Sequence, residues 1–203
     1  GLTSVTIPGS VTSIGEVPFG GCSALTAINV DASYGDTNGD GVINGSDAYD
    51  GAYVSVDGIL YNKTQTTLIQ CPGGKSGAVA IPGSVTSIGT YAFINCISLT
   101  SVTIPAGVTN IEEGAFAGCS ALTAINVNAT NVAYSSVDGI LYDKTQTSLV
   151  QCPGAKSGAV VIPSSVTSIG NDAFFGCSGL TSVTIPNSVT SIRAYAFSGC
   201  SGL

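Results

Sequence analysis

A segment of 23 residues recurs along this chain, and the recurrence constrains the fold more than any other feature. Three copies begin at Leu2, Leu99 and Leu180, and the last reads LTSVTIPNSVTSIRAYAFSGCSG. Two longer units of related sequence lie between them, at residues 25–98 and 122–179. Short periods of this kind are typical of solenoids, in which each unit buries its apolar side chains against its neighbours. We therefore expect residues 1–203 to form a single repeat solenoid.

Each short unit has the pattern of two extended segments followed by a tight turn. In the last copy Leu180, Val183 and Ile185 fit L-x-x-L-x-L, which places Val183 and Ile185 on one face of a strand. The proline that follows ends this strand. A second short extended segment is expected around Ile192, and the AFSGC segment predicts a short helical turn closed by its glycine.

The recurring LTSVTIP, SVTSIG and AFxGC segments resemble the BspA-type leucine-rich repeats. The segment YSSVDGILYDKTQTSLVQCPG, residues 134–154, is similar to the longer units of the same family. The resemblance implies a curved, right-handed, β-rich superhelix of about five to seven coils, with a sheet along one face. It also implies a secreted or surface-anchored protein of a bacterium or protist, usually described as an adhesin, without catalytic residues.

The two long units differ by 16 residues, and the surplus lies in a loop insertion at residues 31–53. This insertion and its borders hold five of the twelve acidic residues. Its centre reads DTNGDGVINGSD, the order D-x-N-x-D-G-x-I-x-x-x-D of an EF-hand-type calcium loop. The candidate metal ligands are Asp36, Asn38, Asp40, Val42 through its carbonyl, Asn44 and Asp47.

Ca²⁺ fits this loop because the ion prefers hard oxygen ligands, which alternate along the segment. Gly41 permits the sharp turn that the sixth position requires, and a bound cation would relieve repulsion between the carboxylates. The twelve residues resemble the loop of dockerin modules, but a second loop and a following amphipathic helix are absent from the sequence. A solvated Asn-Gly-Asp loop without an ion is the alternative.

The seven cysteines follow the repeat. Five occupy one position of the unit and two occupy another, in Q-C-P-G: Cys22, Cys96, Cys119, Cys177 and Cys200, then Cys71 and Cys152. A residue that recurs once per unit forms a ladder inside the stack, so we expect buried free thiols. Stacked neighbours could come close enough for a disulfide, but the odd count and the lack of C-x-x-C argue against it.

Composition excludes several function classes. A net charge of −7 with only five basic residues argues against nucleic acid and anionic membranes as partners. The sequence has no apolar run long enough for a membrane span. Histidine, the usual general base near neutral pH, is absent, so we expect no enzyme. The chain starts in mid-pattern without methionine, which suggests a piece of a longer protein.

Two hypotheses about function follow. The first is an extracellular structural scaffold that assembles end to end into a fibre and is stabilised by Ca²⁺, its partner being a second copy of itself. The alternative is a cell-surface adhesin that binds a host protein or glycan. The outward side chains of the LTSVTIP strands lack the Trp, Tyr and Arg that dominate protein interfaces. An adhesin would therefore use the loop surface that carries Tyr34, Tyr49, Tyr53, Tyr61, Tyr134 and Tyr142.

Overall fold

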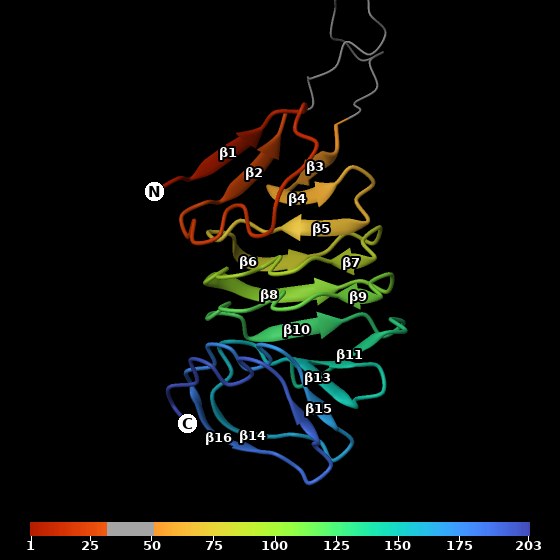
Figure 1. Cartoon of the computed structure of the whole chain (residues 1–203), viewed down its shortest axis with the longest axis vertical. Coiled ribbons are helices and arrows are strands. Elements are labelled where there is room, and N and C mark those ends of the chain that lie inside the picture. The colour runs from red at the N-terminus through yellow and green to blue at the C-terminus, as the bar shows by residue number, and fades with distance from the viewer. Residues whose placement is uncertain (32–50) are drawn as a thin grey trace, which may run out of the picture.

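The computed structural model describes residues 1–31 and 51–203, which form a β-solenoid (Figure 1). Each coil contributes one strand to a first face of the stack, and these strands pair in parallel. The strands of this face are β1 (Ser4–Ile7), β2 (Ala27–Val30), β6 (Ser76–Ala80), β8 (Ser98–Ile104), β10 (Ala124–Val127), β14 (Gly158–Val161) and β16 (Leu180–Thr184). These seven strands agree with the expected number of coils.

The register of the first face follows from the repeat. Val102 of β8 lies opposite Ile125 of β10, one unit later in the chain. Both are fully buried, whereas Thr103, the next residue of β8, is exposed. Because side chains alternate along a strand, equal spacing in every unit puts one apolar row inside and one small polar row outside. The outward row of small polar residues is confirmed.

A second face is made by the SVTSIG segments, as the sequence predicted. Four coils contribute a two-residue parallel strand there, and Ile88 lies opposite Ile111 in this ladder. The strands are β7 (Ser87–Ile88), β9 (Asn110–Ile111), β15 (Ser168–Ile169) and β17 (Ser191–Ile192).

The extra residues of each long unit form a three-stranded antiparallel meander. The strands are β3 (Tyr53–Val56), β4 (Ile59–Asn62) and β5 (Thr67–Gln70), then β11 (Tyr134–Val137), β12 (Ile140–Asp143) and β13 (Ser148–Gln151). Asp57 and Gly58 join β3 to β4 with φ of 50° and 76°, the geometry of a two-residue hairpin turn. β5 and β13 enter the second face in parallel with β7 and β15. The meanders divide the first face into the groups β1–β2, β6–β8–β10 and β14–β16, which Figure 1 shows in succession along the stack.

The expected short helical turns are wrong, because residues 1–31 and 51–203 form no helix and hence none able to cross a membrane. The amides of Tyr91, Phe93 and Asn95 donate to carbonyls of the next coil, at 2.7–3.0 Å. The amides between them close three-residue turns; that of Ile94, for instance, donates to the Tyr91 carbonyl at 2.9 Å. Tyr91 and Asn95 have φ of 53° and 54°, which a right-handed helix cannot contain. Pairing between coils therefore replaces the helical ladder.

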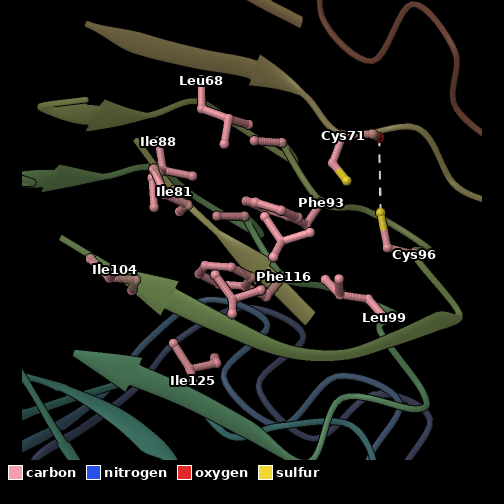
Figure 2. Close-up of a cluster of buried hydrophobic side chains, with 14 of the residues drawn as sticks. Leu68, Cys71, Ile81, Ile88, Phe93, Cys96, Leu99, Ile104, Phe116 and Ile125 are labelled. Atoms are coloured by element: carbon pink, nitrogen blue, oxygen red, sulfur yellow. Dashed lines mark hydrogen bonds between the residues drawn. The ribbon is translucent and has the colours of Figure 1, made fainter. Parts of the chain in front are cut away.

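The core consists of three clusters of aliphatic and aromatic side chains, and Figure 2 shows part of the largest one. Phe93 and Phe116 of successive coils stack with ring centroids 5.1 Å apart, and Phe174 and Phe197 do so at 4.9 Å. Stacking adds to the burial of apolar area, the main source of stability. No single unit has such a core alone, so each coil depends on its neighbours.

Candidate functional site

The six predicted calcium ligands, from Asp36 to Asp47, lie outside the described residues, and the calcium site stays a prediction. Within residues 1–31 and 51–203 no group of three His, Cys, Asp or Glu side chains could hold a metal ion. The surroundings of the insertion are described, however, as is the matching loop of the second long unit. The candidate functional regions are therefore built from the two meanders and the segments that lead into them.

Asn131 organises the loop of the second long unit that matches the insertion. Its side chain is 1% exposed and makes four hydrogen bonds. Nδ2 donates to the carbonyls of Pro105 and Val108, each at 2.9 Å, and Oδ1 accepts from the amides of Ala133 and Tyr134 at 2.8 Å. This one amide satisfies four backbone groups and turns the chain from β10 into β11.

A tyrosine hydroxyl closes the second face at each meander. The Tyr134 hydroxyl accepts the amide of Ile111 at 2.9 Å, and the Tyr53 hydroxyl accepts that of Ile14 at 2.9 Å. Ile111 ends β9, the edge of its sheet, so no strand follows to receive this amide. The hydroxyl replaces the missing carbonyl, since a half-buried amide without an acceptor costs free energy.

A cavity opens at each interruption of the first face. The first has a volume of 510 Å³ and is lined by residues that include Asp57, Tyr61 and Lys75. The second, of 230 Å³, is lined by the matching residues, among them Tyr142 and Lys156. Each lysine is held at the rim by its ammonium, which donates to the carbonyl of the hairpin aspartate at 2.6 Å and 2.9 Å. The same mixed lining thus occurs twice in one chain.

The predicted tyrosine-rich loop surface is corrected in part. Tyr61 and Tyr142 are 1% and 2% exposed, because β4 and β12 lie inside the stack. Tyr53 and Tyr134 are half-buried, and their hydroxyls serve the backbone. These four rings cannot form an open docking surface. The remaining two tyrosines of that set, at positions 34 and 49, lie outside the described residues.

A polar cavity of 370 Å³ lies where the second face is interrupted after β9. Glu112, Glu113 and Arg193 are among its lining residues. Asp172 directly follows one of the lining residues in the chain and is 4% exposed. Its Oδ2 has no hydrogen-bond partner among the described residues. Burial and then Glu113 raise the pKa of Asp172 above its usual value. Sequence reasoning missed this carboxylate, since nothing in NDAFFG distinguishes a buried aspartate from a turn former.

The cysteines form the expected ladder of free thiols. All seven are unpaired, and the five from Cys71 to Cys177 are buried. Three buried thiols donate to carbonyls of the preceding coil, for example Cys119 to Phe93 at 3.0 Å and Cys96 to Cys71 at 3.9 Å, the contact drawn in Figure 2. The other two, Cys71 and Cys152, donate to the carbonyl of the proline that follows each of them. Burial helps to raise the pKa of Cys119 well above its usual value, after its thiol contact with Cys96. The thiols are therefore structural rather than nucleophilic.

The repeat pattern, the parallel ladders and the thiol ladder agree with one family. The BspA-type leucine-rich repeat region matches residues 1–40, 75–155 and 151–203, in six copies. The chain belongs to this BspA-type family. Family membership accounts for the coils that these ranges cover, and the calcium loop of residues 36–47 falls mostly outside the matched ranges. No curated protein sequence matches this chain.

Solved structures of bacterial leucine-rich repeat proteins share the fold. A leucine-rich cell surface protein of Faecalibacterium prausnitzii is 32% identical, with a TM-score of 0.63 over 100% of this chain and 46% of that one. A leucine-rich repeat protein of Eubacterium ventriosum is 25% identical, with a TM-score of 0.64 over 98% of this chain and 51% of that one. This chain therefore spans about half the length of either relative.

Proposed function

We propose that this chain is a non-enzymatic scaffold module of a cell-surface protein, that copies stack end to end, and that Ca²⁺ bound in the insertion stabilises them. The observation that supports the scaffold function is the stack of apolar core clusters between the two faces, to which successive coils contribute matching side chains. The surface location is supported by the relative described as a leucine-rich cell surface protein.

In end-to-end stacking, a second copy would cover the apolar side chains of the last coil. Ile192 and Leu203 are 52% and 53% exposed, whereas the matching Ile169 and Leu180 one coil earlier are fully buried. At the other end Leu2 is 50% exposed. A coil of a second copy placed on either end would bury these side chains in the way that inner coils bury theirs. Such a head-to-tail contact does not close on itself and would grow into a filament.

Calcium binding is supported by the sequence of the insertion and by its place. The insertion connects β2 to β3, the same step that Asn131 fixes in the second long unit. The matching position of the first unit is Asp50, which lacks the donor hydrogens of an amide. A metal-ordered loop would supply the local constraint that the second unit obtains from Asn131.

Sedimentation velocity with Ca²⁺ and with excess chelator tests both parts. Large species that need Ca²⁺, and that Asp40→Ala abolishes, are the expected result. The matched control is Asp138→Ala, which removes a carboxylate from a hairpin turn outside the insertion. A monomer in both conditions would exclude filament growth by this chain, and an unchanged calorimetric baseline on Ca²⁺ titration would exclude the metal site.

The second candidate function is an adhesin, and the duplicated cavities favour it. A scaffold does not require two cavities with matching linings, each with a lysine and an aspartate at its rim. Adhesion of the labelled chain to cultured epithelial cells, compared with Tyr61→Phe and Tyr142→Phe variants, tests it. Equal adhesion by all variants would place the contact elsewhere on the chain.

A further inference from the structure

We infer that the two cavities beside β6 and β14 are sugar-binding sites, each taking one neutral hexose residue of a glycan. The inference deepens the adhesin function and does not depend on end-to-end stacking. The cavities are built from matching residues of the two long units, at the places where the first face is interrupted. They differ mainly in volume, 510 Å³ against 230 Å³.

The first argument is a tyrosine hydroxyl in each cavity that no protein group uses. Tyr61 and Tyr142 line the cavities, yet neither hydroxyl makes a hydrogen bond to another described residue. Neither hydroxyl oxygen is among the buried atoms without a partner, so both remain accessible to solvent or to a ligand. Elsewhere in the stack the tyrosine hydroxyls at the meanders are used, as Tyr134 shows. A ligand hydroxyl in the cavity could take the place of water as the hydrogen-bond partner of this group.

The hydroxyl keeps its proton at every physiological pH. Burial, followed by the nearby Cys152 and Asp138, raises the pKa of Tyr142 to about 12. Burial, followed by Cys71 and Asp57, raises the pKa of Tyr61 further. Each tyrosine can therefore donate one hydrogen bond and accept another, as a sugar hydroxyl also does.

The rim supplies the complementary groups. The Lys75 ammonium donates one of its three hydrogens to the Asp57 carbonyl, which fixes its position. Two hydrogens remain for a ligand. The exposed Asp57 carboxylate accepts hydrogen bonds. Lys156 and Asp138 repeat this arrangement. One positive and one negative group at each rim disfavour an ion of either sign and suit a neutral ligand with both donors and acceptors.

The walls supply an apolar surface for the ring. Val56, Ile59 and Val79 line the first cavity, and their counterparts line the second. Aliphatic walls with a few convergent polar groups are typical of small-molecule sites. The volumes suit a single ring rather than a longer segment. The difference in volume has a cause in the sequence, because Ala80 at the first rim is replaced by Val161, 72% exposed, at the second.

The test is a titration of the whole chain, followed by NMR, with glucose, galactose and mannose and with their neutral oligosaccharides. Two sites per chain are expected for one of these sugars, the first tighter than the second. Tyr61→Phe and Tyr142→Phe each keep the ring and remove the hydroxyl. Each should weaken its own site by roughly tenfold, the effect of one hydrogen bond to a buried group.

Tyr134→Phe is the matched control, because its hydroxyl serves the backbone outside both cavities, and it should leave both sugar sites unchanged. Ala80→Val should lower the affinity of the first site toward that of the second. The inference is overturned if no neutral sugar binds, if a sialylated glycan or a free amino acid binds instead, or if both Tyr→Phe variants bind as well as wild type. Failure of sugar binding would leave the scaffold function untouched, because sedimentation tests that function separately.

Discussion

The residue before each Ala-Phe pair adopts the left-handed backbone conformation, whatever its identity. Tyr91, Asp172 and Tyr195 have φ of 53°, 54° and 55°, and Gly114 stands in the same place at 60°. This conformation is sterically unfavourable for non-glycine residues, and it is least unfavourable for Asn and Asp. The strain is compensated by pairing between coils, since the Tyr91 and Asp172 amides donate to the next coil at 3.0 Å.

Asp172→Asn should stabilise the fold at neutral pH by about 1 kcal/mol, because asparagine tolerates this conformation and removes a buried carboxylate oxygen without a partner. The pKa of Asp172 is raised, so ionisation costs more in the folded than in the unfolded chain. This cost is absent below the unfolded pKa and grows as the pH rises toward the folded pKa. Urea unfolding should therefore show the gain at pH 7 and little gain near pH 3. An equal gain at both values would contradict the assignment.

Asp143 gives the opposite pH dependence. Burial raises the pKa of Asp143, but hydrogen bonds from Ser148, Thr147 and Thr145 together lower it by more, so the net shift of the pKa is downward. Its contribution to stability is present above the unfolded pKa and is lost as the pH falls through the folded pKa. Asn62, at the same place in the first meander, accepts the equivalent amides of Thr66 and Thr67 at 2.9 Å without a charge.

Asp143→Asn should therefore keep the turn and lose this acid sensitivity, with a change below about 1 kcal/mol at pH 7. Asp143→Ala removes the acceptor and should cost more. Thermal unfolding of the two variants and wild type at pH 7 and pH 3 separates these effects. If Asn and Ala variants were equally unstable at pH 7, the side-chain oxygen would not organise the turn.

At the scale of elements, each meander replaces a step of the regular ladder and must supply its own hydrogen bonds. Tyr134→Phe removes the acceptor of the Ile111 amide and should lower the free energy of unfolding by about 1 kcal/mol. Hydrogen exchange at Ile111 should accelerate. Tyr142→Phe is the control, because its hydroxyl has no partner among the described residues and its loss should cost little. Equal costs for the two variants would contradict a capping role.

The strands of both faces could be predicted from the sequence because they depend on local spacing. Leu180, Val183 and Ile192 recur at fixed positions, and alternation decides which side chain is buried. The helical turn could not be excluded in this way. Its amides pair with the next coil, as the Phe93 amide pairs with Ala115 at 2.7 Å, and a contact between units leaves no local signal. The hydrogen bonds of the Tyr53 and Tyr134 hydroxyls could not be predicted for the same reason, since they form only where a strand ladder ends.

For the whole molecule, position in the stack decides reactivity. The five buried thiols face carbonyls inside the column, whereas Cys22 and Cys200 are partly accessible. A thiol reagent should modify at most these two cysteines in the folded chain and all seven after unfolding. Cys200→Ala should remove one fast-reacting thiol without unfolding the chain, since it lies in the last coil. Rapid reaction of a third cysteine would show that the stack opens locally.

The two long units together offer an exchange that tests the insertion. Residues 31–52 can be replaced by NATNVA, which joins β10 to β11 in the second unit. The solenoid should still form, because the new asparagine can donate to the carbonyls of Pro8 and Val11, as Asn131 does to their counterparts. Far-ultraviolet circular dichroism and thermal unfolding with and without Ca²⁺ measure the outcome.

Wild type is expected to gain thermal stability with Ca²⁺, because a ligand that binds only the folded state shifts unfolding in proportion to its saturation. The exchanged chain should lose that gain while keeping its β spectrum. A calcium effect that survives the exchange would place the metal outside the insertion. A chain that no longer folds would show that the first coil needs the longer loop, and that Asn131 cannot serve in its place.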